Sequence, residues 1–179
     1  MSNLTFRAAT PADIPALVQL VTSAYRGEAS RAGWTTEADI LDGQRVDAEA
    51  INADLARERS TILVAEDAQG RLLACCHVAD EDGHGYFGMF AVAPGLQGGG
   101  IGKQLMQAAE THVVREWGLA TMQMTVIDCR EELMAFYERR GYARTGIKKP
   151  FPYGDERFGI PRRDDLRFEV MEKPLGAGA

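Results

Sequence analysis

Residues 90–103 read Phe-Ala-Val-Ala-Pro-Gly-Leu-Gln-Gly-Gly-Gly-Ile-Gly-Lys, and the rest of the fold can be read outward from this stretch. An apolar run from Tyr86 leads into it, and a turn follows at Pro94 and Gly95. A segment with helical periodicity then begins after four closely spaced glycines, Gly98, Gly99, Gly100 and Gly102. The predicted order is therefore strand, glycine loop, helix.

A glycine loop in this position is suited to holding an anion. Glycine has no Cβ, so backbone NH groups can approach a bulky phosphate closely. The unpaired NH groups at the start of a helix also carry partial positive charge toward such a ligand. The alternative is a purely structural turn that lets the strand pack tightly on the next helix.

Composition predicts a single domain. The chain has 179 residues, of which 45% are apolar and 26% charged, and it has neither an internal repeat nor a linker. We expect residues 1–174 to form this domain and residues 175–179 to be a frayed tail. The net charge of -6 argues against nucleic acid as a partner.

The cysteines and the apolar segments narrow the class of protein further. Three cysteines without metal-ligand spacing indicate a reducing compartment and no metal site. No segment approaches 18 apolar residues, so no membrane partner is expected. The first residues lack a basic region followed by an apolar core, and we expect a cytoplasmic protein.

The chain before the glycine loop is predicted to form a strand, two helices and three antiparallel strands. Thr10 and Asp13 are typical of a helix start, and that helix should end near Gly27. Asp47 is a second cap, for a helix that ends near Glu58. The strands are predicted at residues 4–8, 61–66, 71–78 and 86–93.

After the loop, a helix is predicted to end at Gly118, where a glycine suits the C′ position. The next strand, residues 121–127, should run parallel to its predecessor because a helix joins the two. Asp128 and Glu131 are predicted to form a capping box for a short helix that ends at Gly141. The last two strands are predicted at residues 142–147 and 166–173, and a long loop, residues 148–165, connects them.

This order of elements, together with the glycine motif, resembles the GNAT superfamily of acetyl-CoA-dependent N-acyltransferases. The family signature of Gln or Arg, two residues, Gly, one residue, and Gly or Ala is met by Gln97, Gly100 and Gly102. The segment 133–142, which ends in Gly-Tyr, resembles a second landmark of the family. The resemblance implies an α/β (α+β) fold with a mixed central sheet of about seven strands flanked by helices.

A nucleotide-binding P-loop is the rival interpretation of the same glycines, but it requires Gly, four residues, and then Gly-Lys-Ser/Thr. Here Gln104 follows Lys103, and the spacing also differs. The resemblance instead implies acetyl-CoA as co-substrate, with its pyrophosphate on loop NH groups and its pantetheine beside the strand before the loop. The implied cofactor-binding residues are Phe90, Ala91, Val92, Gln97, Gly98, Gly99, Gly100, Ile101, Gly102 and Lys103.

The resemblance also implies catalytic roles. Tyr137 matches the general acid of the family, while the alternative is a ring that only packs beside its helix neighbours. The family often has a glutamate on the strand before the glycine loop, and residues 86–93 contain no carboxylate. The base is therefore left open between water and four side chains that are also explained as turn or cap residues, Glu28, Glu81, His84 and Asp128.

The acceptor is predicted to bind between two loops. The resemblance implies that residues 25–45 and 148–165 form the walls of the acceptor cleft. Both segments carry aromatic and arginine side chains that suit a carboxylate or phosphate on a small amine. A solvated surface is the alternative. The predicted substrate-binding residues are Tyr25, Arg31, Trp34, Tyr153 and Arg162.

The function expected from this sequence is N-acetyl transfer from acetyl-CoA to a primary amine of a small molecule or protein, by direct attack in a ternary complex. A homodimer is compatible with this expectation. The alternatives are a non-catalytic acyl-CoA-binding module of the same fold and a nucleotide-dependent kinase.

Overall fold

The computed structural model describes residues 4–25, 41–42, 46–94, 96, 100–153 and 160–176. The strands are β1 (Thr5–Ala8), β2 (Leu41–Asp42), β3 (Ser60–Glu66), β4 (Leu72–Glu81), β5 (His84–Val92), β6 (Thr121–Ile127), β7 (Ala143–Pro150), β8 (Ile160–Pro161) and β9 (Arg167–Pro174). The helices are η1 (Pro11–Asp13, a 3-10 turn), α1 (Ile14–Tyr25), α3 (Ala48–Ala56), α4 (Ile101–Trp117) and α5 (Glu131–Arg139). No helix in this described part is long and apolar enough to span a membrane.

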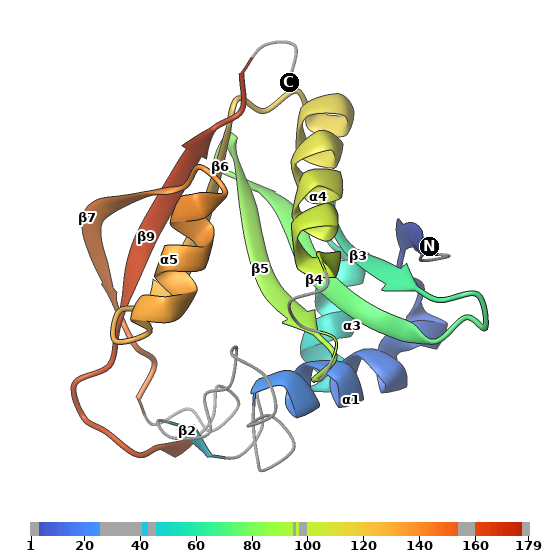
Figure 1. Ribbon diagram of the computed structural model, residues 1–179, viewed down its shortest axis with the longest axis horizontal. Coiled ribbons are helices and arrows are strands. Elements are labelled where there is room, and N and C mark those ends of the chain that lie inside the picture. Colours follow the sequence, from blue (N-terminus) through green and yellow to red (C-terminus); the bar gives the residue numbers. More distant parts are fainter. Residues whose placement is uncertain are drawn as a thin grey trace.

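The centre of the molecule is a seven-stranded mixed sheet with the strand order β1-β3-β4-β5-β6-β9-β7. Figure 1 shows α4 and α5 in front of this sheet and the sheet opening toward the lower edge of the view. The predicted α/β fold with about seven strands is therefore confirmed.

The helix starts in the first half of the chain follow the sequence signals. The Thr10 N–H donates to Asp13 Oδ2 at 2.8 Å at the start of η1, which continues directly into α1. Asp47 caps α3, because its carboxylate accepts the N–H of Ala50 at 2.8 Å. Both predicted caps are confirmed, since each satisfies a backbone NH group that has no partner within the helix.

The second half of the chain also follows its predicted order. Helix α4 ends at Gly118, whose φ of +64° is the left-handed conformation that a C-terminal glycine supplies. Strand β6 then runs parallel to β5, as expected for strands joined by a helix. β9 inserts between β6 and β7 and is antiparallel to both.

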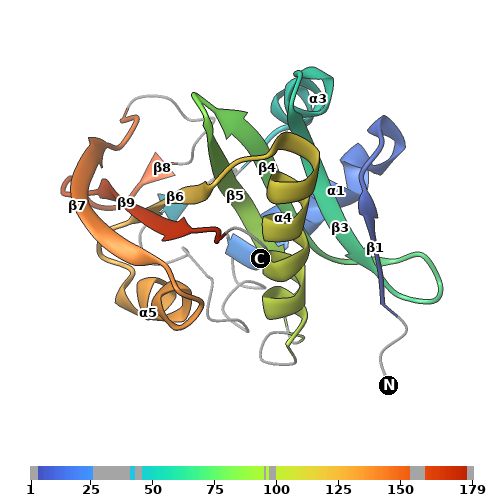
Figure 2. The ribbon, with the colours of Figure 1, turned by 90° about the horizontal axis from the view of Figure 1, so that it is seen from above.

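Two apolar cores cover the two faces of the sheet. The larger core joins alternate residues of β3 to β6 to the inner sides of α4 and α5, and Phe87 and Phe90 belong to it. The smaller core joins the other residues of β3 to β5, including Val64 and Ala91, to α1 and α3. Figure 2 shows α4 and α5 on the side of the sheet away from α3.

A separate two-stranded sheet connects distant parts of the chain. β2 pairs antiparallel with β8, with Leu41 opposite Pro161 and Asp42 opposite Ile160. In Figure 1, β2 lies near the lower edge of the view, toward the open end of the main sheet. The two loops predicted to wall the acceptor cleft are therefore joined here by backbone pairing.

Two local predictions are wrong. Asp128 does not cap α5: the N-cap residue is Arg130, and the Asp128 carboxylate instead pairs with Lys148 and Arg167 on later strands. The predicted tail is not frayed at its first residue, because Leu175 is buried and its N–H donates to the carbonyl oxygen of Ala120 at 2.7 Å.

Candidate active site

Strand β5 loses its neighbour on one side. β6 pairs with β5 only at Gly85 and Tyr86, whereas it stays paired with β9 along its whole length. β4 remains paired with β5 as far as Val92. From Phe87 onward the two strands open into a V, which Figure 1 shows as the divergence of β5 from β6. One backbone edge of β5 is thereby left for a ligand that binds as an extra strand.

The open edge of β5 contains a β-bulge. Between two registered pairs, β4 has only Cys76 whereas β5 has two residues, Met89 and Phe90. Met89 adopts a φ of +49°, which is uncommon for a residue with a side chain. The extra residue shifts the alternation of the strand, so Phe87 and Phe90, three positions apart, both face α4 and α5.

The start of α4 lies against this strand. Gly100 is the N-cap residue, with a φ of +85° that glycine adopts without strain. A Cβ on Gly102 would lie 2.8 Å from Cζ of Phe90, so the absence of a side chain lets the first turn of the helix contact β5. The half-buried Ile101 and the exposed Lys103 also belong to this turn. The predicted loop residues Gln97, Gly98 and Gly99 lie outside the described residues.

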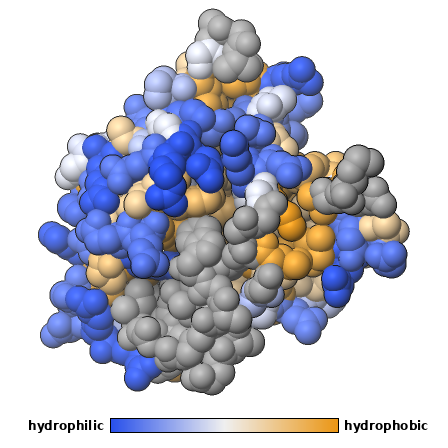
Figure 3. All heavy atoms as spheres, viewed as in Figure 1, coloured by the Kyte–Doolittle hydropathy of each residue, from blue (hydrophilic) through white to orange (hydrophobic). Residues whose placement is uncertain are grey.

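Tyr137 lies inside an aromatic cluster beside the V. Its side chain is only 4% exposed, and its ring centroid is 6.4 Å from that of Phe87 and 6.2 Å from that of Phe90. The ring of Phe136 on the same helix is 5.6 Å away. The predicted acid thus lies next to the open part of β5, and it also packs with Phe136 as the alternative interpretation expected. Apolar side chains are visible between α4 and α5 in Figure 3.

The Gly-Tyr landmark after α5 has a structural explanation. The buried Tyr142 hydroxyl donates to Glu110 of α4 at 2.9 Å, and Lys173 of β9 donates to the same carboxylate at 2.9 and 3.2 Å. Burial, with the Glu110 carboxylate beside it, raises the pKa of Tyr142. These contacts fasten α4 to the strands on the other side of the V.

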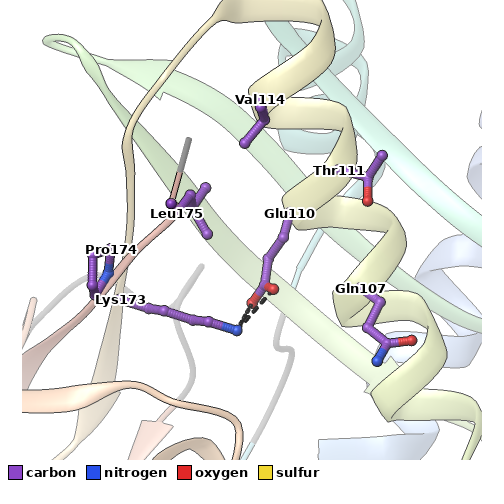
Figure 4. A pocket seen from close by; sticks show the side chains of 8 residues that line it. Gln107, Glu110, Thr111, Val114, Lys173, Pro174 and Leu175 are labelled. Carbon is purple, nitrogen blue, oxygen red and sulfur yellow. Dashed lines mark hydrogen bonds and ion pairs between the residues drawn. The ribbon is translucent and has the colours of Figure 1, made fainter. Parts of the chain in front are cut away.

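Two hollows flank α4 outside the V. The first, of about 380 Å³, contains the Glu110–Lys173 pair and is shown in Figure 4. Its lining residues are Gln107, Glu110, Thr111, Val114, Lys173, Pro174, Leu175 and Gly176. The second, of about 480 Å³, lies between α4 and strands β1 and β3, and it is lined by Phe6, Arg7, Ala8, Leu63, Gln107, Ala108, Thr111, His112, Arg115 and Glu116. Neither hollow contains a residue of β5 or α5.

A polar cluster occupies the opposite face of the sheet, beside α3. The Ser60 hydroxyl donates to the Asp54 carbonyl oxygen at 2.7 Å and lies 2.8 Å from Nε2 of His77. The Asp54 carboxylate is 3.8 Å from Nδ1 of the same imidazole. Burial lowers the pKa of His77, and burial also raises the pKa of Asp54. The ring of Tyr86 lies 5.6 Å from the His77 ring.

The structure does not bring the described base candidates to Tyr137. Glu81 and His84 form the closing pair of the β4–β5 hairpin, and the Glu81 carboxylate pairs with Arg57 at 2.8 Å. At about 3.3 Å per strand residue, His84 is roughly 16 Å along β5 from the bulge at Met89. Asp128 is held by its two cations, and Glu28 lies outside the described residues.

Only some of the residues predicted to bind the acceptor lie in the described part of the chain. Tyr153 is described and its hydroxyl is engaged within its own loop, accepting the Leu166 N–H at 2.7 Å and donating to the Arg163 carbonyl oxygen at 3.2 Å. Arg162 is exposed beside β8. Tyr25 ends α1 but its side chain is not described, and Arg31 and Trp34 lie outside the described residues.

Sequence reasoning missed the bulge and the polar cluster. The bulge left a signal, because the spacing of Phe87 and Phe90 breaks the two-residue period of a strand. His77 stands alone in an apolar run, and its partners come from two other elements, so only the fold assembles the cluster. The described residues contain no group of three or more His, Cys, Asp or Glu side chains that could hold a metal ion.

A sequence profile described as the acetyltransferase (GNAT) family matches residues 15–142, which include the open strand, the start of α4 and Tyr137. The chain belongs to this family. Among curated protein sequences, none matches this chain.

Solved GNAT structures share the whole fold at low sequence identity. The ribosomal-protein-S18-alanine N-acetyltransferase from Escherichia coli has a TM-score of 0.71 and 15% identity, with 98% of this chain and 96% of that chain covered. A mutant of the spermidine N-acetyltransferase SpeG from Vibrio cholerae has a TM-score of 0.69, 16% identity and coverages of 97% and 94%. A nourseothricin acetyltransferase has a TM-score of 0.67, 20% identity and coverages of 98% and 100%.

Proposed function

We propose that the protein is an N-acetyltransferase that transfers the acetyl group of acetyl-CoA to a primary amine of a small molecule or protein, by direct attack in a ternary complex. The observation that carries this proposal is the open edge of β5 next to the start of α4. GNAT enzymes use acetyl-CoA as co-substrate, and the similar solved structures are named for spermidine, a protein alanine and nourseothricin as acceptors.

The residues present fit coenzyme A. A pantetheine arm carries amides, and β5 offers it backbone groups from Phe87 to Val92 that β6 does not pair. The phosphates suit the NH groups at the start of α4, a helix of 17 residues whose N-cap is Gly100. Lys103 in the first turn adds positive charge there. When bound, acetyl-CoA supplies the acetyl group as an activated thioester.

Backbone and side-chain groups of the site can meet two chemical requirements of the transfer. Backbone NH groups of β5 near the bulge are suited to stabilise the oxyanion that forms on the carbonyl. Tyr137 is the proposed general acid, whose hydroxyl donates a proton to the departing thiolate. The acceptor amine must lose its own proton, since an alkyl ammonium with a pKa near 10.4 is neutral in only about 1 molecule in 2,500 at pH 7.

The first test is binding. Coenzyme A should stabilise the folded protein by about 2.7 kcal/mol at one hundred times its dissociation constant, measured as a shift of the unfolding temperature. Adenosine triphosphate at the same concentration is the control, because a nucleotide-dependent kinase would respond to it instead. No shift with millimolar coenzyme A would reject the assignment of the cofactor.

The second test is turnover. A non-catalytic acyl-CoA-binding module has one observation in its favour, which is that β5 carries no carboxylate side chain between His84 and Val92. Release of free thiol from acetyl-CoA across a panel of amines separates the two functions. We expect amine-dependent release; binding of coenzyme A without any release would favour the module.

A further inference from the structure

The first step of the inference is the position of Tyr86. Tyr86 pairs with Gln123, and this is the last pair between β5 and β6 before the strands diverge. Its side chain starts at the apex of the V, and the next residues along β5 lead to the bulge at Met89. Tyr86 and Gly88 are half-buried, whereas Phe87 between them is 2% exposed. Tyr86 therefore keeps part of its surface exposed next to the point where the V begins.

The second step is the direction of the phenol. A Cβ built on Gly88 would overlap the Tyr86 hydroxyl and would lie 2.6 Å from Cζ of the same ring. The phenol thus lies flat along β5, across Gly88, with its hydroxyl directed toward the bulge. Any side chain at position 88 would displace it, so the glycine and the tyrosine form one unit.

The third step is the face of the sheet. Gly88 is in register with His77, and residues opposite each other on paired antiparallel strands point to the same face. Tyr86 therefore lies on the α1 and α3 side of β5. Tyr137 packs against Phe87 and Phe90 on the other side. Two tyrosines thus approach the same part of β5 from opposite faces.

The fourth step is the support behind the ring. The His77 ring lies 5.6 Å from the Tyr86 ring, tilted by 58°, and its Nε2 is held 2.8 Å from the Ser60 hydroxyl. Burial lowers the pKa of His77, and this disfavours a positive charge on the imidazole behind the Tyr86 ring. His77 is in this sense a positioning residue for Tyr86.

We propose that the Tyr86 hydroxyl, held across Gly88 at the apex of the V, receives the acceptor amine by accepting a hydrogen bond from its N–H. This inference rests on the proposed N-acetyltransferase function and adds the residue that orients the nucleophile. The bond aligns the nitrogen beside β5, while Tyr137 serves the leaving thiol from the opposite face. Tyr86 itself neither gains nor loses a proton in this role.

The experiment compares the wild-type protein with Tyr86→Phe, which keeps the ring and removes the hydroxyl. Acetyl-CoA is the donor, and the probe is the best acceptor from a panel that includes spermidine and a peptide with a free N-terminal alanine. We expect KM for the amine to rise about five- to tenfold, as for the loss of one hydrogen bond of average strength. KM for acetyl-CoA and the unfolding temperature should stay close to those of the wild type.

Tyr142→Phe is the matched control, because it removes a hydroxyl that donates to Glu110 of α4, outside the V. It should lower the unfolding temperature and leave the amine KM within twofold. An unchanged amine KM in Tyr86→Phe, with transfer intact in the wild type, overturns this inference alone. Absence of transfer by the wild-type protein overturns the proposed function and this inference with it.

Discussion

On the side of β5 that faces α4 and α5, the rings of Phe87 and Phe90 pack against Tyr137 in a sealed aromatic cluster. On the side that faces α1 and α3, the same strand presents the half-buried Tyr86 and Gly88. A sealed apolar face excludes water from the bond that breaks, whereas a half-open polar face can admit a polar amine. The comparison teaches that one strand can have one face fixed by packing while the other face stays partly accessible; in the proposed function these are the donor side and the acceptor side.

The largest effect is expected from removing the Tyr137 hydroxyl on the aromatic face of β5. Tyr137→Phe removes one hydroxyl and keeps the ring, so folding and coenzyme A affinity should survive. kcat should fall by about 10² to 10⁴, the usual range for loss of a general acid. An acyl donor with a leaving thiol of lower pKa should be less affected, because it departs more easily without a proton. Turnover within twofold of the wild type on acetyl-CoA would remove Tyr137 from the mechanism.

The next effect tests the start of α4, where two glycines serve different purposes. Gly102→Ala brings a methyl group within 2.8 Å of Phe90 and should destabilise the fold by about 1–3 kcal/mol. Gly100→Ala meets only the Gln104 side chain, at an ordinary contact distance of 3.9 Å, but must hold a φ of +85°, so it should disturb the NH groups that face a phosphate more than it disturbs packing. We therefore compare, for each variant, the loss of coenzyme A affinity measured by calorimetry with the loss of folding stability. Relative to its loss of stability, Gly100→Ala should lose more affinity than Gly102→Ala. The reverse ranking would make the loop purely structural.

A smaller effect concerns Asp128, which follows β6 on the other arm of the V. Asp128→Asn should lower the free energy of unfolding by about 1 kcal/mol, because two partly exposed cations lose their shared partner. The dependence of kcat/KM on pH should not change, since Lys148 and Arg167 hold Oδ2 of this carboxylate away from Tyr137. A loss of the acidic limb of that profile, where an essential base becomes protonated, would instead identify Asp128 as the general base.

The smallest effect is expected for the ion pair of Asp13 and Arg7, which lies away from both faces of β5. It gives a reference value for an ion pair that is unrelated to the site. Asp13 pairs with Arg7 at 2.8 Å, and this guanidinium lowers the pKa of the carboxyl to about 2. A carboxyl with a lowered pKa contributes stability above its unfolded pKa near 3.9, and this is lost as the pH falls toward 2. Asp13→Asn should cost about 0.5–1 kcal/mol at pH 7 and almost nothing at pH 2 by urea unfolding. A constant difference across this range would exclude the charge as its cause.

The donor side of the site was largely predictable from the sequence, because its signals are local. Helix periodicity and terminal residues predict α4 between the glycine loop and Gly118, as the structure has it. Asp128 was misassigned because its partners Lys148 and Arg167 come from distant strands and compete with the local cap. Local spacing carries no information about such partners.

The acceptor side was less predictable because it is assembled by tertiary structure. Ser60, His77 and Tyr86 come from three different strands, and only the register brings their side chains together. β2 and β8 have two residues each, which is too short for any periodicity to show. The predicted residues Arg31 and Trp34 stay predictions, as they lie outside the described residues.

The contact between Glu110 and Lys173 has a mechanical consequence. Lys173 is in register with Met122, which is opposite Gly85, so the ion pair lies level with the apex of the V. The ion pair thus holds α4, which follows β5, against β9, which pairs with β6, at the closed end of the V. If the V widens to admit a cofactor, we expect the movement to be largest at the open ends of the strands and smallest where β5 and β6 still pair.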